Sequence, residues 1–100
     1  MNLETKLCGI SMRNPVILAS GILGVSRSLL SEVIRNGAGA VTIKSISHGP
    51  REGHKNPTVV AFDGGMMNAV GYSNPGLEGA RKEFAGVDKL DAPVFASVIG

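Results

Sequence analysis

The chain has 100 residues, 43% hydrophobic and 18% charged, which is the composition of a globular domain with room for one modest core. Its net charge of +2 comes from scattered basic residues without interleaved aromatic ones, which argues against a nucleic-acid-binding surface. No apolar run approaches the roughly 18 residues of a membrane span, and the single cysteine, Cys8, permits no internal disulfide and fits a reducing compartment such as the cytoplasm.

The first predicted element is a small hairpin. Apolar and polar residues alternate on both sides of a central Cys-Gly pair in LETKLCGISM, which predicts two short paired strands within residues 3–12. Asn14 and Pro15 then mark a turn before an unbroken apolar strand, Val16–Ala19. A strand without alternation is typical of a sheet that is buried on both faces.

A helix and a second strand are predicted next. Ser26 or Ser28 can cap the helix, in which apolar residues recur at helical spacing in LLSEVI, and the Asn-Gly pair at 36–37 ends it. The strand Ala40–Ile43 follows. Residues 15–45 therefore form a strand–helix–strand unit of the expected length of about thirty residues.

A long irregular segment, residues 46–67, interrupts this pattern, and only TVVAF within it reads as a strand. Connections longer than about 12–15 residues are uncommon unless they are functional or disordered. We expect His48 and His54 to be solvated loop residues and not metal ligands, because they are six residues apart without a nearby acidic cluster.

A second helix is predicted from Pro75 to about Ala85, with Asn74 as its cap. Its apolar face is predicted to consist of Leu77, Ala80 and Phe84. APVFASVIG then supplies a third buried strand, and alternating strands and helices predict an α/β domain with a parallel sheet. Three strands cannot close a barrel, and a (β/α)₈ barrel needs about 250 residues. We therefore expect residues 1–100 to be the amino-terminal part of one longer domain.

Chemistry in such folds lies at the carboxyl ends of the parallel strands. The residues predicted there are Ser20 and Gly21 after the first strand, Lys44 and Ser45 after the second, and Asn68–Tyr72 after the long segment. Lys44 would bring a cation to this end, where it can hold an anion or phosphate, unless it reaches solvent or pairs with an acid. Asn68 has no capping role to explain it. Cys8 is expected at the opposite end of the strands, away from chemistry.

Taken together, these residues resemble the amino-terminal third of the class 1 dihydroorotate dehydrogenases, and most closely class 1B. The matching segments run in the family's order over nearly the whole chain and are NPVILASG, GAGAVTIKSIS, PREGHKNP, GMMNAVGYSNPG and PVFASVIG. The resemblance implies an FMN-binding (β/α)₈ TIM barrel, of which the chain covers the amino-terminal hairpin and about the first three β/α units. It also implies the oxidation of dihydroorotate to orotate in pyrimidine biosynthesis.

The resemblance assigns site residues by position. Those that would bind FMN are Ser20, Gly21, Lys44 and Ser45. Those that would bind orotate are Lys44, Asn68, Ala69, Val70, Gly71 and Tyr72. The Asn68 amide can donate and accept hydrogen bonds at once, which suits a ligand with a carboxylate and ring amides. Tyr72 departs from the family, which commonly has leucine there. The catalytic base, a cysteine or serine on a later loop, would fall beyond Gly100, so we expect the chain alone to be inactive.

The resemblance also implies partners. They are an electron-transfer subunit carrying FAD and an iron–sulfur cluster, and further copies of the full-length chain in a homo-oligomer. The electron acceptor is left open among NAD, fumarate and others. Three other interpretations fit the same residues. They are a dihydropyrimidine dehydrogenase-type flavin barrel, a Schiff-base aldolase barrel with Lys44 as nucleophile, and a fragment or binding module that is inactive in isolation.

Overall fold

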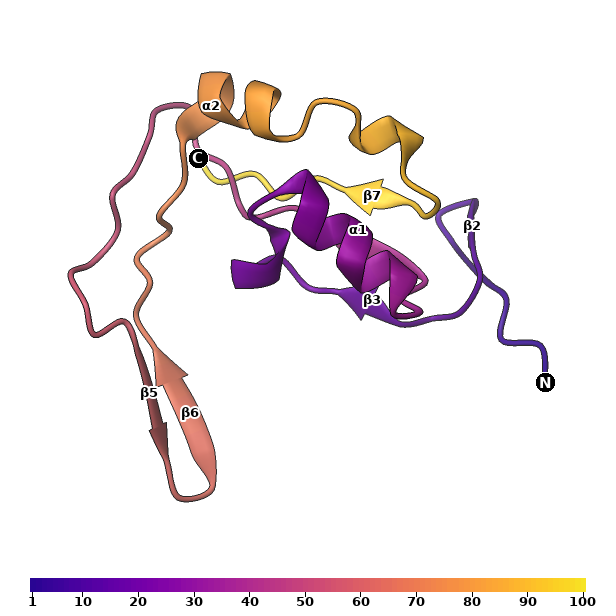
Figure 1. Cartoon of the computed structure of the whole chain (residues 1–100), viewed down its shortest axis with the longest axis horizontal. Helices are drawn as coiled ribbons and strands as arrows, with labels where there is room; N and C mark the ends of the chain where they lie inside the picture. Colours follow the sequence, from indigo (N-terminus) through magenta and orange to yellow (C-terminus); the bar gives the residue numbers. More distant parts are fainter.

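The computed structural model describes all 100 residues and contains a three-stranded parallel sheet and two separate hairpins (Figure 1). The parallel strands are β3 (Ile17–Leu18), β4 (Ala40–Thr42) and β7 (Val94–Phe95). Ile17 lies opposite Ala40 in the first pairing, and Val41 lies opposite Val94 in the second. The order of the strands in the sheet follows the chain, which confirms the predicted parallel α/β architecture.

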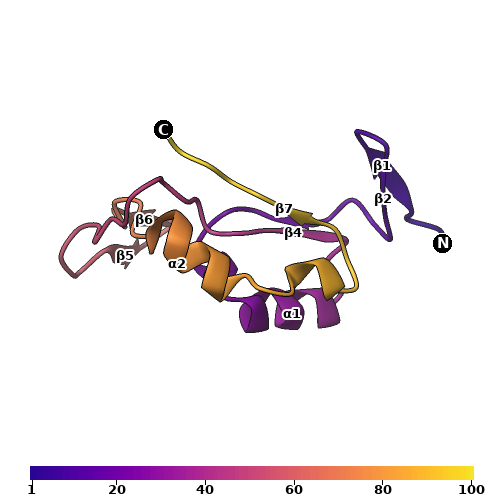
Figure 2. The ribbon, with the colours of Figure 1, turned by 90° about the horizontal axis from the view of Figure 1, so that it is seen from above.

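Two helical segments connect these strands. The first is η1 (Ile22–Gly24) followed by α1 (Arg27–Arg35), and the second is α2 (Gly76–Glu83) followed by η2 (Val87–Lys89). No helix has the length and apolar character that crossing a membrane requires. Both α-helices cover the same face of the sheet (Figure 2). Barrel walls carry their helices on one face in this way, whereas doubly wound sheets carry them on both.

Local signals explain the ends of α1, which forms where it was predicted. Ser26 is the N-cap, and its Oγ accepts the backbone N–H three residues further on at 3.2 Å. The helix ends at Asn36 and Gly37, where the backbone of the glycine takes a φ of 104°. Leu30 and Ile34 are buried one turn apart, so the apolar stripe of α1 faces the sheet.

The core lies between the helices and the sheet. Its buried residues are Leu30, Ile34, Ala38, Val41, Ile43, Ile46 and Ala80. The central strand β4 is largely buried, but β3 and β7 are only half-buried. The prediction of strands buried on both faces is therefore wrong for these two. Each has a paired neighbour on one side only, and the helices of this chain cover a single face.

The helix α2 begins at Gly76, one residue later than Pro75, the predicted start. Ala80 is 5% exposed and Phe84 packs against the core, as expected for its apolar face. Leu77 is 43% exposed, so its assignment to that face is wrong. The backbone N–H of Leu77 bonds to the carbonyl of His48 at 3.1 Å, so the first turn of α2 lies against the loop that follows β4.

The predicted amino-terminal hairpin is confirmed. β1 (Thr5–Leu7) pairs with β2 (Ile10–Met12) in antiparallel fashion. The turn between them is formed by Cys8 and Gly9, both with positive φ, and the thiol is exposed. This hairpin lies at the opposite end of the molecule from the second one (Figure 2).

The second hairpin consists of β5 (Val59–Phe62) and β6 (Gly65–Asn68), and it projects away from the sheet (Figure 1). The strand β5 was predicted, but β6 was not, because glycine, methionine and asparagine carry a weak preference for strands. The signal that would have found it is Asp63-Gly64, a dipeptide typical of a two-residue hairpin turn. All eight strand residues are exposed in this chain.

Gly24 sets how closely η1 approaches the end of β4. Its carbonyl accepts the backbone N–H of Lys44 at 2.7 Å, and a Cβ at Gly24 would lie only 2.6 Å from the carbonyl oxygen of Thr42. A residue without a side chain is needed for backbones to come this close. The contact holds the backbone of Lys44 at the carboxyl end of β4.

We predict that Gly24→Ala lowers the free energy of unfolding by about 1–3 kcal/mol, because the added methyl group forces the two backbones apart. Gly49→Ala is the matched control, since a Cβ there meets no atom within 4 Å. Urea unfolding measures the stability of both variants, and hydrogen exchange of the Lys44 amide reports on the local contact. Equal stability of the two variants would contradict the prediction.

Candidate functional site

A cavity of about 630 Å³ opens at the carboxyl ends of β3 and β4, with β6 and the residues after it on the other side. The predicted site residues all line it, and they are Ser20, Gly21, Lys44, Ser45, Asn68, Ala69, Val70, Gly71 and Tyr72. Residues that are up to about fifty positions apart in the chain thus meet in one place. What they bind stays a prediction.

The long segment returns to the sheet because its backbone pairs with the residues that lead into α2. Arg51 and Asn74 exchange two backbone hydrogen bonds of 2.9 Å, and the N–H of His54 donates to the carbonyl of Val70 at 3.1 Å. Gly53 makes this pairing possible, since a Cβ there would lie 2.3 Å from the Val70 oxygen. The pairing turns the segment after β6 back toward the ends of β3 and β4.

One buried amide, that of Asn74, holds this arrangement. It is 7% exposed. Its Nδ2 donates to the carbonyl of Tyr72 at 2.8 Å and to the Oγ of Ser47 at 2.9 Å. Its Oδ1 accepts the N–H of Gly76 at 2.9 Å and that of Ser47 at 3.2 Å. Asn74 was predicted to be the N-cap of α2, but Pro75 occupies that position. The amide uses all its hydrogen-bonding positions to join loop and helix, where a cap would use one.

A chain of serine hydroxyls crosses the carboxyl ends of the three parallel strands. Ser20 donates to the carbonyl of Ile43 at 2.8 Å. The Oγ of Ser45 lies 3.0 Å from that of Ser20 and 2.8 Å from that of Ser97. A hydroxyl has one proton, so Ser45 must donate to Ser20, and Ser97 to Ser45. Ser20 and Ser45 therefore face the cavity with lone pairs and no proton to give.

Ser97 is a polar residue at this end of the sheet that the sequence interpretation missed. The signal was present, because Ala-Ser follows the third strand just as Ala-Ser follows the first. His54 was also missed as a site residue. It is exposed, as a solvated loop residue should be, but it also lines the cavity, which it reaches through the pairing with Val70.

Lys44 is half-buried and has no acidic partner. The ion pairs of the chain are Arg35 with Glu32 and Arg81 with Glu78, both on exposed helix surfaces. The alternative in which Lys44 pairs with an acid is therefore wrong, since no carboxylate lies close enough. Its ammonium lies 6.0 Å from the centroid of the Tyr72 ring. A partly desolvated cation without a counter-ion favours an anionic ligand.

The two asparagines of NAVGYSN differ sharply in their surroundings. The Asn74 amide is saturated with internal hydrogen bonds, whereas Asn68, at the end of β6, is exposed and directs no side-chain hydrogen bond to the rest of the chain. Apolar side chains of Ile22, Val59 and Met66 form the neighbouring wall of the cavity. The Asn68 amide is therefore free to pair with a polar ligand that lies against this wall.

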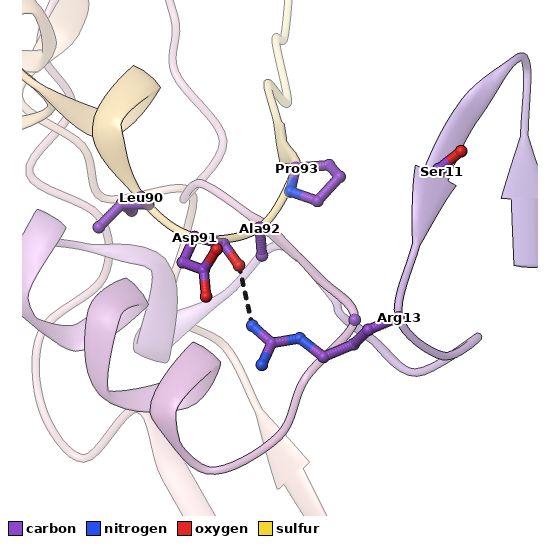
Figure 3. Close-up of a pocket in the computed structure, with 7 residues that line it drawn as sticks. Ser11, Arg13, Leu90, Asp91, Ala92 and Pro93 are labelled. Atoms are coloured by element: carbon purple, nitrogen blue, oxygen red, sulfur yellow. Dashed lines mark hydrogen bonds between the residues drawn. The ribbon is translucent and has the colours of Figure 1, made fainter. Parts of the chain in front are cut away.

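A second cavity of about 520 Å³ lies at the opposite end of the sheet (Figure 3). Its lining comes from residues that precede β4 and β7 and from the end of the first hairpin, and Arg13 Nη2 donates there to the carbonyl of Asp91 at 2.9 Å. Residues at the amino ends of parallel strands serve stability rather than chemistry. No group of three or more histidine, cysteine or acidic side chains is arranged to hold a metal ion.

Comparisons with protein families and with curated proteins point to the same family. A family model described as dihydroorotate dehydrogenase matches residues 2–100. The dihydroorotate dehydrogenase B (NAD(+)) catalytic subunit of Methanothermobacter thermautotrophicus is 50% identical over 98 residues, which are 98% of this chain and 32% of that protein. The proteins of the same name from Methanocaldococcus jannaschii and Pyrococcus abyssi are 45% and 46% identical, over 98% of this chain and 33% and 32% of their own lengths. The chain thus spans about a third of these curated relatives.

We predict that Asn74→Ala lowers the free energy of unfolding by about 1–3 kcal/mol, because it leaves the buried N–H of Gly76 and the partly buried carbonyl of Tyr72 without their partner. Asn68→Ala, the matched substitution at an exposed amide, should stay within about 0.5 kcal/mol of the parent. Urea unfolding of both variants makes the comparison. If Asn68→Ala cost as much as Asn74→Ala, the structural role assigned to Asn74 would be refuted.

Proposed function

Because the chain belongs to the dihydroorotate dehydrogenase family, we propose that it forms the FMN- and substrate-facing part of a class 1B catalytic subunit. The proposed reaction is the oxidation of dihydroorotate to orotate in pyrimidine biosynthesis, and the proposed location is the cytoplasm. The sheet with its helices on one face supports a (β/α)₈ barrel, of which residues 1–100 would be the first part of a single domain.

The observation that carries the proposal is the shared cavity of Lys44 and Asn68. Lys44 has an ammonium group without a counter-ion, and Asn68 has an amide whose donors and acceptor are free. Orotate carries a carboxylate and ring amide groups, which are the partners that these two side chains lack. The second cavity, at the amino ends of the parallel strands, offers no comparable pair of groups.

The residues at the strand ends fit FMN. A volume of about 630 Å³ lies in the range of small-molecule sites, and the wall that includes Ile22 is apolar, as a flat ring requires. The hydroxyls of Ser20 and Ser45 have lone pairs but no free proton, so they would accept hydrogen bonds from ring N–H groups. Gly21 has open space where a Cβ would stand, which allows close approach of a ligand to its backbone. FMN supplies the hydride-accepting ring that protein side chains lack.

The side chains of this chain would bind, orient and stabilise charge. The ammonium of Lys44 favours negative charge that develops in a site from which water is excluded. Asn68 would orient the substrate ring by pairing with its amide groups. A base is also needed for the proton at C5. The class 1 resemblance places that base, a cysteine or serine, on a later loop, and the chain's one cysteine, Cys8, lies in the distant hairpin. We therefore propose that the base lies beyond Gly100 and expect residues 1–100 alone to be inactive.

The names of the relatives support the rest of the proposal. They specify NAD(+) and a catalytic subunit. We propose NAD as the final electron acceptor, reached through a separate subunit that carries FAD and an iron–sulfur cluster, and a homo-oligomer of the full-length catalytic chain. The family match does not favour the dihydropyrimidine dehydrogenase-type barrel or the Schiff-base aldolase.

We predict that Lys44→Ala in the full-length protein weakens orotate binding by about 1.5–3 kcal/mol and also lowers flavin content, because it removes a charge-assisted contact that both ligands use. Asn68→Ala should weaken orotate binding while flavin content stays near that of the parent. Lys55→Ala is the control, since Lys55 is an exposed lysine outside the cavity.

Titration of orotate followed by flavin absorbance measures all three variants. Orotate binding by Asn68→Ala as tight as that of the parent would remove the basis for its assigned role. A full-length parent that purified without flavin and bound no orotate after incubation with FMN would overturn the proposed function itself.

A further inference from the structure

We propose that Tyr72 is a positioning residue, whose ring holds the ammonium of Lys44 over the cavity and whose loss would weaken anion binding there. The part that concerns the ligand rests on the proposed function. The part that concerns Lys44 and Tyr72 rests on the geometry of the chain alone.

Two cations stand over the same ring. The Nζ of Lys44 and the Cζ of Arg51 each lie 6.0 Å from the centroid of Tyr72. The negative face of an aromatic ring attracts a cation at this separation. No other ring in the chain has a cation over it. For Lys44, which has no carboxylate partner, the ring is therefore the electrostatic contact that limits where its flexible stem can go.

The backbone imposes the direction of this ring. Tyr72 has a φ of 55°, a left-handed conformation that is rare for a bulky side chain and persists only where its surroundings enforce it. The Asn74 amide supplies part of that enforcement, because its Nδ2 donates to the Tyr72 carbonyl at 2.8 Å. Gly71, with a φ of 76°, packs on His54 immediately before it.

Arg51 is placed beside Tyr72 by separate contacts. Its backbone exchanges two hydrogen bonds with that of Asn74, so the start of its side chain is fixed relative to the tyrosine. Lys44 reaches the same ring from the end of β4, where Gly24 holds its backbone. The ring thus has two like charges near it, Lys44 in the lining of the cavity and Arg51 beside it. Two neighbouring cations favour an anion that approaches this ring.

The substitutions that test this role are Tyr72→Leu, which removes the ring and keeps apolar bulk, and Tyr72→Phe, which keeps the ring. Phe62→Leu is the matched control, because Phe62 is 55% exposed against 56% for Tyr72 but lies outside the cavity. All are made in the full-length protein, and urea unfolding confirms that each variant folds. Should Tyr72→Leu not fold, Tyr72→Met removes the ring with a more adaptable side chain.

The first measurement does not depend on function. In protein carrying ¹³C at the lysine ε-carbons, a lysine that lies over an aromatic ring shows a ring-current shift, and Lys44→Ala identifies the Lys44 signal by its disappearance. We expect this shift in the parent, in Tyr72→Phe and in Phe62→Leu, and its loss in Tyr72→Leu. A Lys44 signal without a shift in the parent, or a shift that survives in Tyr72→Leu, would overturn the proposal.

The second measurement is orotate binding, followed by flavin absorbance. Tyr72→Leu should bind roughly two- to fivefold more weakly than the parent, which is the range expected from one exposed cation–π contact. Phe62→Leu should match the parent, and Tyr72→Phe, which keeps the ring, should bind more tightly than Tyr72→Leu. Unchanged binding by Tyr72→Leu, with the Lys44 shift lost, would refute the positioning role. If the parent bound no orotate, the proposed function would fail, and the Lys44 signal would still decide whether Tyr72 holds that side chain.

Discussion

The side-chain amide of Asn74 joins three stretches of chain, namely the loop after β4, the residue Tyr72 and the first turn of α2. All of its donors and acceptors are used, and it is almost completely buried. A connection as long as the one between β4 and α2 loses considerable conformational entropy when its ends are brought together. The hydrogen bonds of Asn74, with the backbone pairing of Arg51, offset that loss and place the far wall of the cavity.

A second constraint divides the molecule into two ends. Parallel pairing of β3, β4 and β7 brings all three carboxyl ends to the same edge, where hydroxyls and the Lys44 ammonium gather. The opposite edge carries backbone contacts such as that of Arg13 with Asp91. The parallel pairing therefore places the groups that can meet a ligand at one end of the sheet and stabilising contacts at the other.

The parts that could be predicted from the sequence are those whose signals are local. Ser26 and the Asn-Gly pair mark the ends of α1, and unbroken apolar runs mark β3 and β4. Because chemistry in α/β folds lies at the carboxyl ends of the strands, the sequence also predicted that Lys44 and Asn68 lie together, and both line one cavity. The position of Asn74 at the centre of a loop junction could not be read in this way, because its partners lie up to 27 residues away. The predicted burial of Leu77 was wrong for a similar reason. Its surroundings depend on the contact of the first turn of α2 with His48, which is 29 residues away in the sequence.

The hydrogen-bonded row of Ser20, Ser45 and Ser97 has a consequence for the order in which the polypeptide folds. Ser45 bonds to hydroxyls that are 25 and 52 positions away, on either side of it in the sequence. Contacts over such separations form slowly, because each closes a long loop before it gains any stabilisation. We therefore expect the cavity to mature after the local helices and hairpins. A small molecule that binds only the mature cavity would, by mass action, draw incompletely assembled chains toward the folded state.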